Sequence, residues 1–106
     1  MPKYLIQARY TAEGAKGLLA EGGTKRRDAA VKAIKTAGGK VEAFYFAFGK
    51  TDAICLVDVP DNATMTAASL AINASGAVTT ATTVLLTPAE VDEAVKRSVS
   101  YRAPGQ

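Results

Sequence analysis

The chain has 106 residues, of which 48% are hydrophobic and 22% charged, and its net charge is +3. This length and composition predict one globular domain with a single core and exclude a disordered chain. No apolar run approaches the roughly 20 residues that span a bilayer, and the basic residues form no stripe with aromatic partners. We therefore expect neither a membrane nor a nucleic acid as a partner.

The chain has no histidine and a single cysteine, Cys55. These counts argue against the common transition-metal sites, histidine–cysteine catalysis and serine triads, so we expect no metal and no cofactor. Cys55 lies among apolar residues, which predicts a buried, unreactive thiol. A lone cysteine, and a start without a signal-peptide cleavage site, lead us to expect a cytoplasmic protein.

The first predicted strand is residues 3–10, with Tyr4, Ile6, Ala8 and Tyr10 on one face. We expect a short helical turn at residues 15–21, because Gly14 and Gly17 weaken a longer helix there. A main helix is predicted from Lys25 to Ala37, with Thr24 as its N-cap and Gly38 and Gly39 after its end. Its apolar stripe is Ala30, Val31, Ile34 and Ala37.

The segment from Val41 to Pro60 reads as a β-hairpin with strands at 41–48 and 53–59. A two-residue loop at Lys50 and Thr51 would pair Phe48 with Ala53, Phe46 with Cys55 and Phe44 with Val57, and these six would form the core under the helices. A loop one residue longer would reverse the faces of the second strand. Neither strand has a plainly polar face, so we expect the sheet to be covered on both sides.

After the hairpin, Asp61 or Asn62 is the expected cap of a helix at residues 63–73, with Met65, Ala68, Ala71 and Ile72 as its apolar stripe. A fourth strand is predicted at 79–87. Thr87, Pro88 and Glu90 then form a capping box that starts a third helix, whose stripe is Val91, Ala94, Val95 and Val99.

The β-α-β-β-α-β order with a C-terminal helix predicts an α+β, ferredoxin-like fold with an antiparallel four-stranded sheet. We expect one domain at residues 1–100 and a poorly ordered tail at 101–106. Right-handed crossovers place both main helices on one face of the sheet. The other face carries Leu5, Ile54 and Leu56, which predicts a homo-oligomer that pairs through this face.

Several stretches of the chain resemble the GYD-domain family of small ferredoxin-like proteins of the dimeric α/β-barrel type. They are residues 4–6, 23–27, 48–52, 58–61 and 82–86. The Gly-Tyr-Asp signature of the family aligns with Gly49, Thr51 and Asp52, so Thr51 replaces the tyrosine. The resemblance implies the fold and implies no particular activity. Asp52 is expected to bond backbone N–H groups of the turn rather than to act as a base.

Two groups of residues are candidate sites. Thr24, Lys25, Arg26 and Arg27 follow two glycines at a predicted helix start, which is typical of an anion site. The alternative is that these side chains are solvated or paired with Glu21 and Asp28.

Arg9, Tyr45 and Asp58 lie on the presumed open sheet face, where they would bind a polar aromatic molecule. The alternative is that they satisfy one another at an oligomer interface, because buried polar groups need partners.

Two classes of function follow. The first is a small oligomeric ligand-binding or assembly module, whose partners are a second copy of itself and a small anionic or aromatic ligand. The second is a cofactor-free enzyme of the dimeric α/β-barrel kind, oxygenase- or isomerase-like, acting on a small aromatic or polyketide-like substrate. The absence of histidine and of an acid–base pair at recognisable spacing favours the first class.

Overall fold

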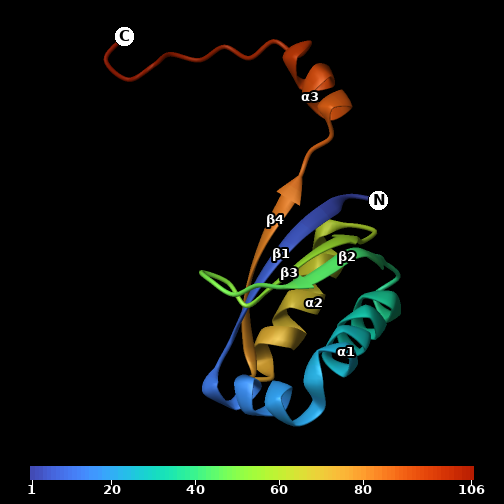
Figure 1. Cartoon of the computed structure of the whole chain (residues 1–106). Coiled ribbons are helices and arrows are strands. Elements are labelled where there is room, and N and C mark those ends of the chain that lie inside the picture. The colour runs from blue at the N-terminus through green and yellow to red at the C-terminus, as the bar shows by residue number, and fades with distance from the viewer.

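The computed structural model describes all residues, 1–106, and has one four-stranded sheet and three helices (Figure 1). The elements are β1 (Lys3–Tyr10), α1 (Ala12–Thr36), β2 (Lys40–Phe46), β3 (Ala53–Asp58), α2 (Asn62–Ala74), β4 (Val78–Leu85) and α3 (Pro88–Val95). The predicted order is confirmed, and the fold is α+β and ferredoxin-like. None of the three helices is both long enough and apolar enough to cross a membrane.

The strands lie in the order β2-β3-β1-β4, and all neighbours are antiparallel. Both α1 and α2 lie on one side of this sheet (Figure 1). The opposite side, which we call the open sheet face, is covered by no element of the chain. Directly paired residues share a face. The open sheet face therefore contains Lys3, Leu5, Gln7, Arg9, Ala43, Tyr45, Ile54, Leu56, Asp58, Thr79, Ala81, Thr83 and Leu85.

The hairpin register differs from the prediction by two residues. Phe46, not Phe48, pairs with Ala53, and Phe44 pairs with Cys55. The loop is longer because Ala47 N donates to Asp52 O at 2.8 Å, whereas Lys50 and Thr51 are a poor pair for a tight turn. A shift of two keeps the side chains on their predicted face. Phe48 is nevertheless fully exposed and Phe46 is also exposed, so the prediction of both as core residues was wrong.

A β-bulge at Glu42 separates the pair Val41–Val57 from the pair Ala43–Leu56. The extra residue in β2 turns Val41 toward the helices and leaves Ala43 on the open sheet face. The prediction missed this irregularity. The shift of two residues alone would pair Val57 with Glu42, and the bulge makes Val41 its partner instead.

The prediction for α1 was wrong at its start. The helix runs from Ala12, with Thr11 as N-cap, and includes the segment predicted as a short turn. It is kinked at Gly22, where φ is 82° and ψ is 173°, so this glycine, and not Thr24, marks the start of the second half. This φ is positive and suits glycine alone, because other residues carry a Cβ.

The other caps were predicted correctly. The Asp61 side chain accepts from Thr64 N at 2.8 Å at the start of α2, and Thr87 with Glu90 forms the capping box of α3. The predicted bounds of β4 lay one or two residues too late. The predicted apolar stripe of α3 included Val99, but the helix ends at Val95, so that part of the prediction was wrong.

The core lies between the sheet and the two long helices. It contains Tyr4, Ile6, Ile34, Val57, Val59 and Met65. The hydroxyl of Tyr4, which is only 1% exposed, donates to Asn62 Oδ1 at 2.5 Å, so its burial leaves no polar atom without a partner. Two residues of the stripes predicted for the two long helices, Val31 and Ala71, are exposed rather than buried.

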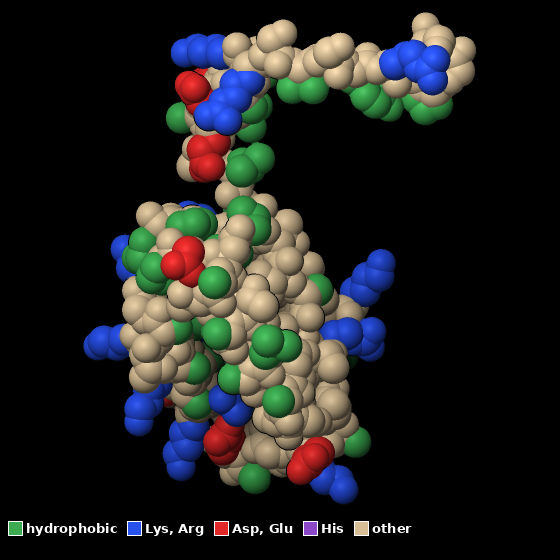
Figure 2. All heavy atoms as spheres, turned by 180° about the vertical axis from the view of Figure 1, so that it is seen from behind, with side chains coloured by type: hydrophobic (Ala, Val, Ile, Leu, Met, Phe, Trp, Pro, Cys, Tyr) green, Lys and Arg blue, Asp and Glu red, His purple; other side chains and the backbone are tan.

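Beyond β4, residues 86–106 lead away from the sheet, and we call this segment the C-terminal arm (Figure 1). It gives the chain a radius of gyration of 17.0 Å, against about 13 Å for a compact domain of this length. Figure 2 shows hydrophobic side chains along one side of the arm.

Candidate functional site

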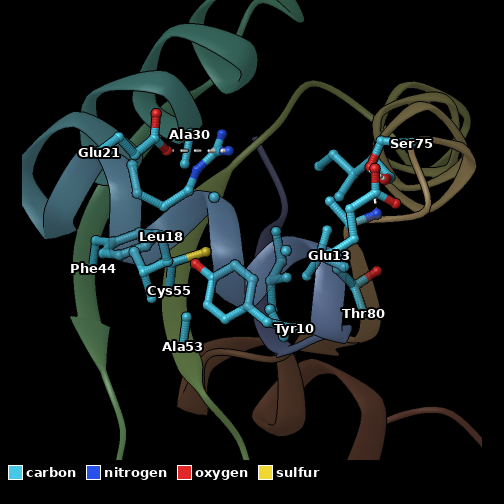
Figure 3. A pocket seen from close by; sticks show the side chains of 18 of the residues that line it. Tyr10, Glu13, Leu18, Glu21, Ala30, Phe44, Ala53, Cys55, Ser75 and Thr80 are labelled. Carbon is cyan, nitrogen blue, oxygen red and sulfur yellow. Dashed lines mark hydrogen bonds and ion pairs between the residues drawn. The ribbon is translucent and has the colours of Figure 1, made fainter.

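A cavity of about 460 Å³ lies between the sheet, α1 and the end of α2, and we call it the helix-side pocket (Figure 3). Most of its wall is apolar. Its lining residues are Ile6, Ala8, Tyr10, Glu13, Gly14, Gly17, Leu18, Glu21, Arg26, Ala30, Ile34, Phe44, Ala53, Cys55, Ile72, Ser75, Ala77, Val78 and Thr80. This size lies within the range of about 300–1,000 Å³ usual for small-molecule sites.

The floor of the pocket comes from alternate residues of the strands. Tyr10, Phe44 and Cys55 all lie on the helix side of the sheet, because alternate strand residues share a face. In Figure 3 the ring of Tyr10 points into the pocket toward Cys55. The floor is therefore partly aromatic, with one hydroxyl and one thiol.

The first half of α1 forms one wall. Gly14, Gly17, Leu18 and Glu21 recur on one face of this helix and all line the pocket. A Cβ on Gly14 would lie 1.9 Å from the backbone oxygen of Ala77, so only glycine allows this close approach. A Cβ on Gly17 would meet nothing within 4 Å, so this position borders empty space.

Charged groups are confined to the rim. Arg26 Nη1 lies 3.7 Å from Glu21 Oε1, the ion pair drawn in Figure 3. Glu13 adds a second carboxylate to the rim. The positive charge of Arg26 is therefore balanced within the site, and the rim as a whole is not cationic.

Burial raises the pKa of two pocket groups. The pKa of the Cys55 thiol rises to about 11. The pKa of Tyr10 is raised mainly by burial, against an opposing effect of the positive charge of Arg26. Both side chains therefore stay protonated at neutral pH, and the Tyr10 hydroxyl is available as a hydrogen-bond donor and acceptor.

The structure places Arg9, Tyr45 and Asp58 on the open sheet face, outside the helix-side pocket. Arg9 lies near the end of β1, whereas Asp58 of β3 pairs with Lys3 at the start of β1, roughly 20 Å away along the strand direction. Asp58 accepts from Lys3 Nζ at 3.0 Å, and Lys3 also pairs with Glu42. These two carboxylates raise the pKa of Lys3. Within one chain the three predicted residues form no common cluster.

The predicted anion-binding residues lie in α1, just after the kink. Arg26 turns to the pocket and pairs with Glu21, while Arg27 Nη2 pairs with Asp28 at 3.0 Å. Thr24 and Lys25 are exposed. The structure therefore brings Arg26 into the pocket and shows the two ion pairs that were the alternative to an anion site.

Of the family-signature residues, Asp52 has a defined role. Its carboxylate accepts from Tyr10 N at 2.8 Å, and its own N–H donates to Ala8 O at 2.8 Å. Asp52 thus bonds a backbone N–H as predicted, although the donor belongs to β1 and not to the turn. Thr51 is half-buried and does not line the pocket. Nothing in the structure explains glycine at Gly49.

Of the residues that line the pocket, only Arg26 was predicted from the sequence as a site residue. One signal was present: the small and acidic residues Gly14, Gly17 and Glu21 share a helical face. The two glycines were interpreted as helix breakers, which hid this pattern.

The fold and the pocket define a small ferredoxin-like protein with a cavity between its sheet and helices. A family model described as the GYD domain matches residues 4–95. The chain therefore belongs to the GYD-domain family, as the resemblance of its sequence indicated. Comparison with curated proteins and with solved structures gave no match.

Proposed function

We propose that this protein is a self-associating binding protein for a small, mainly apolar molecule held in the helix-side pocket. The observation that carries the proposal is the cavity of about 460 Å³, whose wall is apolar and whose charges lie at the rim. Ligand sites of this kind combine apolar walls with few polar groups that set orientation.

An aromatic ligand suits this pocket better than a small anion. Phe44 and Tyr10 supply aromatic contacts, and the Tyr10 hydroxyl supplies one hydrogen bond. The only cation at the rim, Arg26, is paired with Glu21, and Glu13 adds a further negative charge. The electrostatics of the rim therefore disfavour a free carboxylate or phosphate.

Self-association is supported by the open sheet face. Leu5, Ile54 and Leu56 lie side by side there, and no element of the same chain covers them. Two-fold pairing of identical faces is the commonest way in which a soluble protein buries such a surface.

Binding is favoured over catalysis by the state of the pocket groups. A nucleophilic cysteine needs a lowered pKa, and a general base needs one near neutrality. Burial moves the pKa of Cys55 to about 11 and raises that of Tyr10. Both groups are thereby suited to contact a ligand rather than to attack it or remove its proton.

The test uses native mass spectrometry for a retained molecule, and titration with the uncharged aromatic fluorophore N-phenylnaphthylamine. The variant Gly17→Leu places a side chain in the empty space beside Gly17. It is expected to weaken probe binding by about tenfold or more, because it fills the site. The matched control Ala15→Leu introduces the same side chain at an exposed position outside the pocket and should bind like the parent. Equal binding by both variants would contradict the proposal.

A further inference from the structure

The C-terminal arm carries an apolar series without an intrachain partner. The exposed fractions are 65% for Leu86, 46% for Val91, 76% for Val95, 83% for Val99 and 77% for Tyr101. Figure 2 shows such side chains gathered on one side of the arm. An isolated helix shorter than about 12 residues is marginal in water, and α3 has eight. A surface that holds α3 is therefore needed.

The arm does not return to its own sheet. Only Leu86 and Thr87 connect β4 to α3. Thr87 is extended, with φ −76° and ψ 158°, as expected of a residue before proline. Glu90 N donates to Thr87 Oγ1 and Thr87 N donates to Glu90 Oε1, both at 3.1 Å, which fixes the direction in which α3 starts. The arm continues outward beyond the end of β4 (Figure 1).

We propose that two copies of this chain exchange their C-terminal arms, with α3 of each copy packed against the open sheet face of the other. Both unpartnered apolar surfaces occur in the same chain, which makes a second copy the complementary occupant. β4 is an edge strand, and its last residue, Leu85, lies on the open sheet face, so the arm begins beside the surface on which a second copy would stack. A two-fold arrangement then covers both arms and both faces.

The contact is made by Val91, Ala94 and Val95, which lie on one side of α3. The opposite side carries Ala89 and the charged residues Glu93 and Lys96, which stay in water. The inference rests on the proposed self-association and is independent of the ligand in the helix-side pocket.

Photo-crosslinking tests the location of the arm. The full chain carries benzoylphenylalanine in place of Val95 and is mixed with an isotope-labelled copy before irradiation. The expected product joins a labelled to an unlabelled chain, with the crosslink in β1 or β3 on the open sheet face. A crosslink within one chain, a crosslink to the outer side of α1 or α2, or a dimer that gives no crosslink would overturn the inference.

A second measurement uses sedimentation equilibrium of the double variant Val91→Glu/Val95→Glu. The dissociation constant of its dimer is expected to rise about tenfold or more, because two apolar contacts are replaced by carboxylates. These side chains are exposed in the single chain, so the circular dichroism spectrum of the variant should match that of the parent. The control Ala89→Glu lies on the opposite side of α3 and should dimerise like the parent.

The outcomes separate the two proposals. A parent chain that is monomeric at micromolar concentration removes both the self-association and the arm exchange. A dimer that responds equally to the double variant and to the control keeps the self-association and removes the arm exchange.

Discussion

Replacing Gly22 with alanine tests whether the kink in α1 is imposed by the fold. Gly22 has φ 82° and ψ 173°, a region almost confined to glycine. An alanine held there costs on the order of 1–3 kcal/mol. Its restricted unfolded state and better helix propensity offset about 1 kcal/mol of this. The variant Gly22→Ala should therefore lose up to about 2 kcal/mol of unfolding free energy if the kink is kept.

The matched control is Gly17→Ala, which changes the same residue type in the same helix. Gly17 has no positive φ, and its added Cβ meets nothing within 4 Å. This control should gain up to about 1 kcal/mol from helix propensity. The assay is urea unfolding followed by circular dichroism, at one protein concentration because self-association shifts stability. If both variants are stabilised equally, the kink is not required and the reasoning is refuted.

Three further changes have defined outcomes in the same assay. Gly14→Ala should destabilise by about 1–3 kcal/mol, because its Cβ would lie 1.9 Å from the oxygen of Ala77; unchanged stability would contradict this close approach. Asp52→Ala should cost about 1–3 kcal/mol by leaving the N–H of Tyr10 without its acceptor, whereas Asp52→Asn, which keeps an oxygen, should retain most of the stability. Burial raises the pKa of Cys55 from 9.0 to about 11. The contribution of the protonated thiol to the free energy of unfolding is therefore present below pH 9 and is lost toward pH 11. The stability difference between the parent and Cys55→Ala should shrink over that interval and stay constant below it.

Much of the fold was predictable because local signals and topology agreed. The caps at Asp61 and Thr87, the alternation in β1 and the order of elements all follow from residues close together in the sequence. The hairpin register was predicted wrongly because it depends on residues far apart in the sequence. It depends on Asp52, whose bonds to Ala8 and Tyr10 in β1 extend the loop, and those residues are more than 40 positions away.

The pocket was harder to predict than the fold because it is a space between elements. Its position depends on the distance between α1 and α2, which no local pattern specifies. The kink at Gly22 carries the first half of α1 to the end of α2, where Gly14 meets Ala77. Arg26 was predicted as a surface cation of an anion site. That it lines a cavity depends on how α1 is oriented against the sheet, which the sequence does not specify.

The family signature and the pocket are linked through the end of β1. Asp52 accepts from Tyr10 N, and in the next residue Thr11 N donates to Ala77 O at 3.1 Å while the Thr11 side chain accepts from Gly14 N at 3.2 Å. These three bonds hold the point where the strand becomes the helix, and with it the Tyr10 ring that enters the pocket. The aspartate of the signature thus supports the pocket from outside, without lining it. Thr51 takes no part in these bonds, so its place in the signature does not alter the support that Asp52 gives.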